Sequence, residues 1–364
     1  MYNFLMLARE LIKRVPKVEL HDHLDGGVRI ETILDIAKRE SIDLPSRDPE
    51  KLKDFFIRGC RQKSLVLYLE TFAVTTAVMQ RREDLERIAY EAVEDLSKEN
   101  VVYAEIRFAP SLHTERGLSL EEIVEAVLLG LERGKRDFGM SYGLLLCAMR
   151  NESPERTMRI ASLAICYRDR GIVGLDLAGG EAGFPAKNHK AAFDYMRANN
   201  GYITIHAGEA AGPESIHQAI QLCGAHRIGH GVRLIEDMKV EGRRIEKLGS
   251  LSQYLLDRGV PMEMCLTSNV GTGAVESYEK HPFPLFYHNG FCACLCSDNR
   301  LMSGTDLTEE MAIACEEYGL GIDDLERITL NAMKSAFLHH REKLQLIEVI
   351  RKRYEQLRRD FDCL

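Results

Sequence analysis

Near its start the chain reads Glu19-Leu20-His21-Asp22-His23-Leu24-Asp25-Gly26. The residues from Lys17 onward predict a short strand that Gly26-Gly27 ends. Because residues two apart on a strand face the same side, His21 and His23 stand about 7 Å apart along it and can converge on one metal ion. Asp25 continues this face at its rim. An H-x-H pair by itself is more typical of ordinary exposed or core histidines, so its meaning depends on the rest of the chain.

Short apolar or β-branched runs alternate with longer amphipathic stretches along the chain. The short runs predict strands over Val18–His23, Val101–Phe108, Ser141–Ala148, Ile172–Leu177, Tyr202–His206, Arg227–His230, Pro261–Leu266 and Phe291–Ser297. The amphipathic stretches predict helices over Arg82–Lys98, Leu120–Asp137, Glu155–Asp169, Asn188–Asn199, Pro213–Leu222, Leu307–Tyr318 and Leu338–Phe361. Eight strands separated by helices favour a closed parallel (β/α)₈ TIM barrel of the α/β class over an open doubly wound sheet.

We interpret residues 1–364 as a single barrel domain, because no repeat, low-complexity linker or break in composition divides them. No G-x-G-x-x-G follows a predicted strand and no Walker motif occurs, so dinucleotide and P-loop phosphate binding have no support. The stretch Leu44–Gln80 is partly helical and is inserted between the first two strands. Long insertions after a barrel strand lie on the face where active sites are built.

The composition argues against two classes of partner. The chain has 364 residues, 45% of them hydrophobic and 29% charged, and a net charge of −8. This sign, without a basic tract, excludes a typical nucleic-acid-binding protein. The apolar run Phe4–Ala8 is too short for a signal peptide or a membrane span. Ten cysteines without a secretion signal indicate reduced thiols, and we therefore expect a cytoplasmic enzyme.

Further metal-capable residues occur where other predicted strands end. His206 ends one strand, His230 ends the next, and Asp298 follows a third. A lone histidine at a strand end is usually structural. Together with the H-x-H pair, however, the chain places five such residues at the carboxyl ends of four strands, where barrel enzymes carry their chemistry. This pattern predicts a metal site.

The ordered motifs H-x-H-L-D-G, D-L-A-G, H-A-G-E, R-I-G-H-G and S-D-N resemble the adenosine deaminase family of metal-dependent barrel hydrolases, in its bacterial type. The resemblance spans nearly the whole chain. It implies one zinc ion per chain, with His21, His23, His206 and Asp298 as its ligands. It also implies Glu209 as the group that protonates the purine ring, His230 as partner of the water on the metal, Gly179 as a backbone contact to the purine, and Asp25 as the partner of the ribose 5′-hydroxyl.

The position of Glu209 agrees with an acid role without the family name. It lies three residues after His206, and a dry, apolar pocket would raise the pKa of its carboxyl so that it holds a proton. The alternative is a carboxylate favoured by the helix dipole before Pro213. The strand that ends at Leu177 contains no lysine, whereas two-metal relatives commonly use a modified lysine there, so we expect one metal.

Two other features concern the substrate. Leu65, Tyr68, Leu69 and Phe72 recur at i, i+3, i+4 and i+7, which is one apolar face of a helix. That face could pack on the barrel, or it could close over the purine as the lid that the resemblance implies. Asn299 stands where animal members of the family carry a second aspartate, which leaves the contacts near N7 of the base in doubt.

The sequence thus predicts zinc-dependent hydrolysis of adenosine and 2′-deoxyadenosine to inosine or deoxyinosine and ammonia, in purine salvage. One alternative is the same chemistry on 5′-methylthioadenosine, adenine or an aminodeoxyfutalosine-type nucleoside. Asp25 argues for a substrate with a free 5′-hydroxyl, because a thioether offers it no donor. The other alternative is a catalytically inactive binding protein on this fold. The sequence leaves the oligomeric state open.

Overall fold

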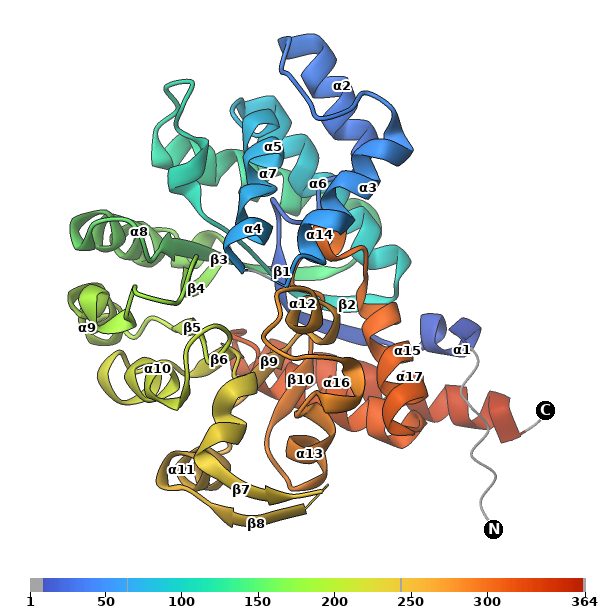
Figure 1. The fold of residues 1–364 in the computed structure, drawn as a ribbon. Coiled ribbons are helices and arrows are strands. Elements are labelled where there is room, and N and C mark those ends of the chain that lie inside the picture. The colour runs from blue at the N-terminus through green and yellow to red at the C-terminus, as the bar shows by residue number, and fades with distance from the viewer. Residues whose placement is uncertain (1–8, 64, 243, 363–364) are drawn as a thin grey trace.

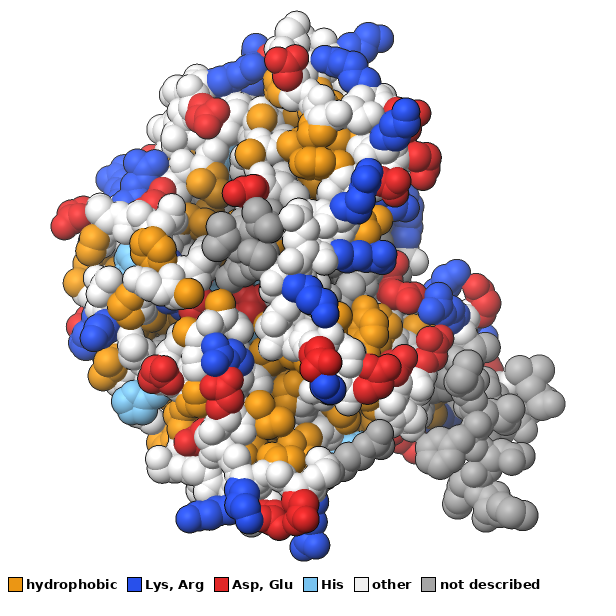
Figure 2. All heavy atoms as spheres, viewed as in Figure 1, with side chains coloured by type: hydrophobic (Ala, Val, Ile, Leu, Met, Phe, Trp, Pro, Cys, Tyr) orange, Lys and Arg blue, Asp and Glu red, His pale blue; other side chains and the backbone are white. Residues whose placement is uncertain are grey.

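The computed structural model describes residues 9–63, 65–242 and 244–362, and among these the side chains of all but residues 65–67, 361 and 362. The apolar run Phe4–Ala8 lies outside the described residues. Within them, strands gather around the centre of the molecule and helices surround them (Figure 1). None of the described helices has the length and apolar character that a membrane crossing requires. On the face shown in Figure 2, acidic and basic side chains are interspersed among apolar ones.

The central strands form two parallel four-stranded sheets. The first has the order β1 (Lys17–His23), β2 (Val101–Phe108), β3 (Ser141–Met149), β4 (Ile172–Ala178), and the second has the order β10 (Ala293–Leu295), β9 (Met262–Met264), β6 (Arg227–His230), β5 (Thr204–Ala207). Parallel single bridges join Asp22 to Asp298 and Leu175 to Ile203, one at each seam between the sheets. The α/β TIM barrel expected from the alternating pattern is confirmed.

Helices follow most strands and cover the outside of the sheet. Their bounds are α1 (Arg9–Arg14), α2 (Ile30–Glu40), α3 (Pro49–Cys60), α4 (Leu65–Glu70), α5 (Phe72–Val78), α6 (Arg82–Lys98), α7 (Leu120–Phe138), α8 (Pro154–Cys166), α9 (Lys190–Ala198), α10 (Pro213–His217), α11 (Ser250–Arg258), α12 (Leu266–Gly271), α13 (Phe283–His288), α14 (Arg300–Ser303), α15 (Leu307–Tyr318), α16 (Ile322–Ser335) and α17 (His340–Asp362). Local sequence explains several ends. Ser119 and Glu122 form a reciprocal capping box at α7, and Gly139 ends that helix in the left-handed conformation.

The structure corrects several predicted boundaries. The strand expected over Pro261–Leu266 covers only Met262–Met264, and that expected over Phe291–Ser297 covers only Ala293–Leu295. After β10 the backbone bonding to its neighbours continues in part, because Cys296 N–H donates to Met264 O and Asp298 N–H donates to His21 O. An antiparallel hairpin of β7 (Met238–Glu241) and β8 (Arg244–Leu248) was not predicted, and it lies at the edge of the molecule (Figure 1). Its alternating half-exposed residues pack outside the barrel.

Candidate metal centre and active site

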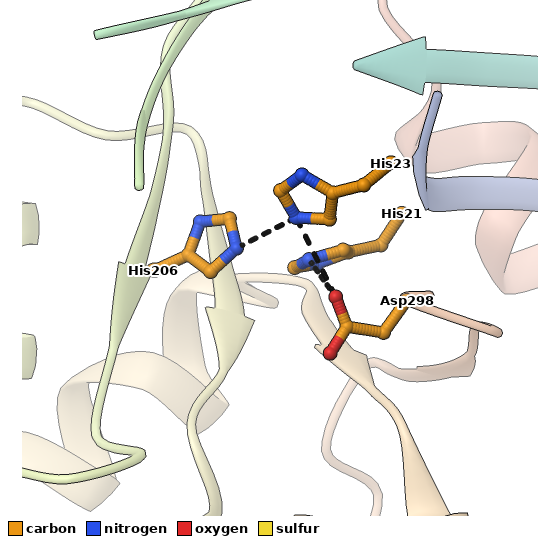
Figure 3. Close-up of side chains that lie close together, drawn as sticks. All are labelled: His21, His23, His206 and Asp298. Carbon is orange, nitrogen blue, oxygen red and sulfur yellow. Dashed lines mark hydrogen bonds and ion pairs between the residues drawn. The ribbon is translucent and has the colours of Figure 1, made fainter. Parts of the chain in front are cut away.

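Three histidines and one aspartate from distant parts of the chain point toward one another at the barrel mouth (Figure 3). Nε2 of His23 lies 3.2 Å from Nε2 of His206, and Oδ1 of Asp298 lies 3.3 Å from Nε2 of His21 and 3.4 Å from Nε2 of His23. His21 and His23 end β1, His206 lies in β5, and Asp298 follows β10. The structure thus brings together the four residues that the family resemblance implies as metal ligands.

Two buried carboxylates decide which nitrogens of this cluster carry protons. Nδ1 of His21 lies 2.9 Å from Oε2 of Glu263, and Nδ1 of His206 lies 3.1 Å from Oδ1 of Asp176. Burial alone would raise the pKa of Glu263, but Arg107 and Arg227 beside it hold that pKa well below its usual range. An ionised carboxylate only accepts hydrogen bonds, so both Nδ1 atoms donate and the Nε2 atoms of His21 and His206 face the cluster. Against burial and the charge of Arg107, hydrogen bonds to Asp298 and Glu263 raise the pKa of His21 to about 9.

These Nε2 atoms converge with that of His23 on the carboxylate of Asp298. Nε2 of His21 is buried and has no hydrogen-bond partner among the described residues. The carboxylate of Asp298 therefore stabilises a positive charge at this point, either a proton on His21 or a metal ion. Imidazole nitrogen with one carboxylate oxygen is a donor set that suits zinc and related divalent ions. The cluster therefore fits a metal ion, and carboxylates behind the histidines are the usual supports of such ligands.

Asp298 and His230 both adopt left-handed backbone conformations, with φ of 60° and 65°. This conformation is uncommon for residues other than glycine, and it persists only where surrounding contacts enforce it. At Asp298 two backbone hydrogen bonds to β1 supply that constraint. His23 N–H donates to Asp298 O, and Asp298 N–H donates to His21 O, each at 2.7 Å. The turn directs the Asp298 side chain at the histidines. Ser268 Oγ then donates to its other oxygen, Oδ2, at 2.5 Å.

Glu209 is buried beside the metal cluster. Thr272 Oγ1 donates to its Oε1 at 3.1 Å, and Nε2 of His230 lies 3.7 Å from its Oε2. Burial, with the nearby charges of Asp298 and Glu181, raises the pKa of Glu209 to about 8. A carboxyl with this pKa holds a proton at neutral pH and can donate it, as acid catalysis requires.

Glu181 holds the turn that carries Glu209. Its two carboxylate oxygens accept the backbone N–H groups of Gly208, Glu209, Ala210 and Ala211 at 2.7 to 3.0 Å. Its bonds fix four consecutive backbone groups, which aims the Glu209 side chain into the site.

A cavity of about 590 Å³ opens beside the cluster. Its lining includes most of the residues predicted to contact substrate, which are Asp25, Gly179, Asn299, Tyr68, Leu69 and Phe72, together with Glu209 and His230. The side chain of Leu65 lies outside the described residues. The single helix expected across these residues is divided at Thr71, with Tyr68 and Leu69 on α4 and Phe72 at the start of α5. These three side chains still line the same cavity.

Two of the residues that line the cavity carry buried polar atoms without partners. Oδ1 of Asp25 and Oδ1 of Asn299 are buried and lack hydrogen-bond partners among the described residues. Burial raises the pKa of Asp25 to about 7. A Cβ at Gly26 would stand 2.0 Å from Oδ1 of Asn299, so only glycine allows the two segments this close approach. Among the described residues that line the cavity, none is Lys or Arg.

The sequence did not predict several residues that surround the site. They are Arg107, Glu263, Ser268, Asn269, Thr272 and His281, all buried. One signal was available, because Glu263 is the single charged residue of the strand Met262–Met264. Arg107 lies on β2 and the remaining four lie in loops or in the short helix α12, and nothing in their local pattern distinguishes them from ordinary polar residues.

Comparison with known proteins agrees with this geometry. The family model described as adenosine deaminase matches residues 16–353. The chain is similar to proteins named adenosine deaminase from Mycolicibacterium gilvum (strain PYR-GCK), at 49% identity over 96% of this chain and 98% of that protein, and from Mycobacterium ulcerans (strain Agy99), at 50% identity over 97% and 99%.

Two solved structures share the fold. An adenine deaminase from Arthrobacter aurescens superposes with a TM-score of 0.84 at 25% identity, covering 93% of this chain and 98% of its own. An N6-mAMP deaminase from Arabidopsis superposes with a TM-score of 0.81 at 29% identity, covering 94% and 99%. The match to the family model over almost the entire chain, with relatives near half identical, shows that this chain belongs to the adenosine deaminase family.

Proposed function

We propose that this protein is a zinc-dependent enzyme that hydrolyses adenosine and 2′-deoxyadenosine to inosine or deoxyinosine and ammonia, and that it serves purine salvage in the cytoplasm. The observation that carries the proposal is the position of Glu209. A buried carboxyl with a pKa of about 8 stands in one cavity with the metal-binding cluster, so an acid and a water-activating site face the same space.

His21, His23, His206 and Asp298 would hold one zinc ion per chain. A zinc ion in such a site lowers the pKa of bound water to about 7 and so supplies a nucleophile at neutral pH. Glu209 donates its proton to N1 of the purine as water attacks C6, which lets the ring accept the electron pair of the former double bond. Glu209 is protonated again by the proton that the attacking water releases. The C6–N bond then breaks as the amino group takes the proton of the new C6 hydroxyl and leaves as ammonia, so that a carbonyl oxygen remains on C6.

The remaining lining residues favour a nucleoside. Asp25 offers an unpartnered buried oxygen that suits the 5′-hydroxyl of the ribose, and Asn299 offers an amide near the base. Gly179 has φ of 90°, and a side chain there would stand 3.1 Å from Cε of Met149 and narrow the place of the purine. Because no described lining residue is Lys or Arg, a nucleotide phosphate would lack a cationic partner. We therefore expect AMP to be a poor substrate, unlike the substrate for which the Arabidopsis relative is named.

The insertion and the domain boundaries belong to the same proposal. Residues 1–364 act as one barrel domain, and residues 44–80 cover the cavity. Leu65, Tyr68, Leu69 and Phe72 would exclude water from the bound purine. A dry cavity maintains the raised pKa of Glu209, so the covering helices support the acid as well as the binding of the base.

The test is the ultraviolet absorbance change of purified protein with adenosine, before metal removal, after chelation and after zinc is returned. We expect conversion that chelation abolishes and zinc restores. The same assay with 2′-deoxyadenosine, adenine, 5′-methylthioadenosine and AMP ranks substrates. Preference for adenine or for the thioether would overturn the choice of adenosine and keep the chemistry. A zinc-loaded protein inactive on every 6-aminopurine would overturn the enzymatic proposal.

A further inference from the structure

A chain of hydrogen bonds reaches His230 at Nδ1, the ring nitrogen that does not face Glu209. In each bond of this chain the structure identifies the donor and the acceptor. The first bond begins at the backbone N–H of Phe283, which can only donate and lies 3.1 Å from Nδ1 of His281. Nδ1 of His281 therefore accepts. His281 is 2% exposed, and burial lowers its pKa to about 3, so the ring is neutral. A neutral imidazole that accepts at Nδ1 carries its proton on Nε2.

Asn269 continues this direction. Nε2 of His281 lies 3.2 Å from Oδ1 of Asn269, and the backbone N–H of Cys265 also reaches this oxygen, at 3.4 Å. Two donors on one atom identify it as the amide oxygen, which settles the orientation of the side chain. The amide nitrogen Nδ2 then lies 3.0 Å from Nδ1 of His230.

An amide nitrogen only donates, so Nδ1 of His230 must accept this bond. The single proton of neutral His230 consequently lies on Nε2, the atom that faces the site 3.7 Å from Oε2 of Glu209. Because Nδ1 accepts a hydrogen bond and carries no proton, the ring is neutral. His230 and Asn269 are 1% and 0% exposed, which leaves no solvent to supply another partner at Nδ1.

We propose that Asn269, oriented by His281, is a positioning residue that keeps the proton of His230 on Nε2, so that His230 meets the attacking water as a hydrogen-bond donor and not as a base. This inference rests on the proposed function for the identity of the water, while the placement of the proton stands apart from it. As a donor, His230 stabilises negative charge that develops on the attacking oxygen, which is the effect of an oxyanion-hole group.

The tautomer can be read directly. Zinc-loaded protein with ¹⁵N- and ¹³C-labelled histidine rings gives nitrogen and carbon shifts that distinguish a protonated from an unprotonated ring nitrogen. The His230 signals are identified by their loss in His230→Gln. We expect an unprotonated Nδ1 and a protonated Nε2. A proton on Nδ1 in the wild-type protein would overturn the proposal whether or not adenosine is the substrate.

Variants of Asn269 test its part in this arrangement. Asn269→Asp keeps the shape but replaces the donor with an acceptor, so we expect Nδ1 of His230 to gain a proton. His230 then no longer donates from Nε2 to the attacking oxygen. We expect kcat to fall at least about 10-fold while KM stays within about 3-fold, because loss of one oxyanion-hole donor in other enzymes lowers kcat about 10²- to 10³-fold. Asn269→Leu, which is similar in size and offers no hydrogen bond, should give a mixture of both tautomers and an intermediate kcat.

The same exchange at an exposed residue, Asn188→Asp, is the matched control and should change neither the tautomer nor kcat. A purely structural Asn269 predicts a different result. Both variants would then lower thermal stability but leave the His230 proton on Nε2, and the isosteric Asp variant would retain wild-type kcat. Either of these observations would overturn the positioning role, and the wild-type spectrum decides the tautomer even if a variant fails to fold.

Discussion

Arg107 donates to Asp176 in the interior of the barrel, with Nη1 and Oδ2 3.1 Å apart. The same guanidinium reaches Oε2 of Glu263 through Nη2 at 2.8 Å. Asp176 and Glu263 are the two carboxylates that hold His206 and His21. One buried arginine on β2 thus fixes the separation of the supports behind two metal-binding histidines from opposite sides of the barrel.

Replacing Arg107 should therefore weaken both the fold and the metal site. In Arg107→Gln the two carboxylates lose a shared cation, and breaking a buried ion pair typically lowers the free energy of unfolding by about 3–5 kcal/mol. We expect metal affinity to fall about 10- to 100-fold, as for other losses behind metal ligands. Urea unfolding and metal content after dialysis measure the two effects. Arg159→Gln is the control, because its ion pair with Glu121 lies on the surface. Wild-type metal retention in Arg107→Gln would contradict the arrangement.

Glu209→Gln should separate binding from chemistry. The amide keeps the size of the side chain and can still receive the hydrogen bond from Thr272, but it cannot give a proton to the purine. We expect kcat for adenosine to fall about 10²- to 10⁴-fold, the usual contribution of a general acid, while zinc content stays at one per chain. Stopped absorbance assays and metal analysis give both numbers. A variant that deaminates at the wild-type rate would show that Glu209 is not the acid.

The raised pKa of Glu209 predicts the direction of the pH dependence. Only the protonated carboxyl can donate, so kcat/KM should decline as the pH rises through about 8. The hydroxyl of Thr272 donates to this carboxyl, which stabilises its charged form and lowers its pKa. Thr272→Val removes that bond, and the declining limb should move to higher pH. If the decline of kcat/KM moved to lower pH in Thr272→Val, the titration would belong to another group. The same conclusion would follow if the residual activity of Glu209→Gln kept the wild-type decline.

Asp25 should affect substrates according to their 5′ position. We expect Asp25→Ala to raise KM for adenosine about 10-fold or more, because the variant loses the hydrogen bond to the 5′-hydroxyl. A 10-fold change corresponds to about 1.4 kcal/mol of binding free energy. 5′-Deoxyadenosine lacks the hydroxyl, so its KM should change little in the same variant. Steady-state kinetics with both compounds make the comparison internally controlled. An equal effect on both would place Asp25 away from the ribose 5′ position.

The order of strands and helices could be predicted from the sequence because each depends on local periodicity. β2 and β6 were predicted with their observed bounds, and so were α6 and α15. The short strands β9 and β10 were predicted too long, since apolar residues continue into turns that are buried against the barrel and carry the same pattern. The hairpin β7–β8 has exposed, charged strands and so gives little periodic signal.

The sequence by itself determined that four strands end in metal-capable residues, because parallel strands of a barrel must all present their carboxyl ends on one face. It could not determine which polar residues stand behind them. Asn269 meets His230 across 39 positions of the chain and His21 meets Glu263 across 242. Those contacts, the left-handed turns at His230 and Asp298, and the direction of the hydrogen bonds that reach His230 depend on the closed barrel. They arise only when segments distant in sequence are packed together without water, which makes each buried donor find an acceptor.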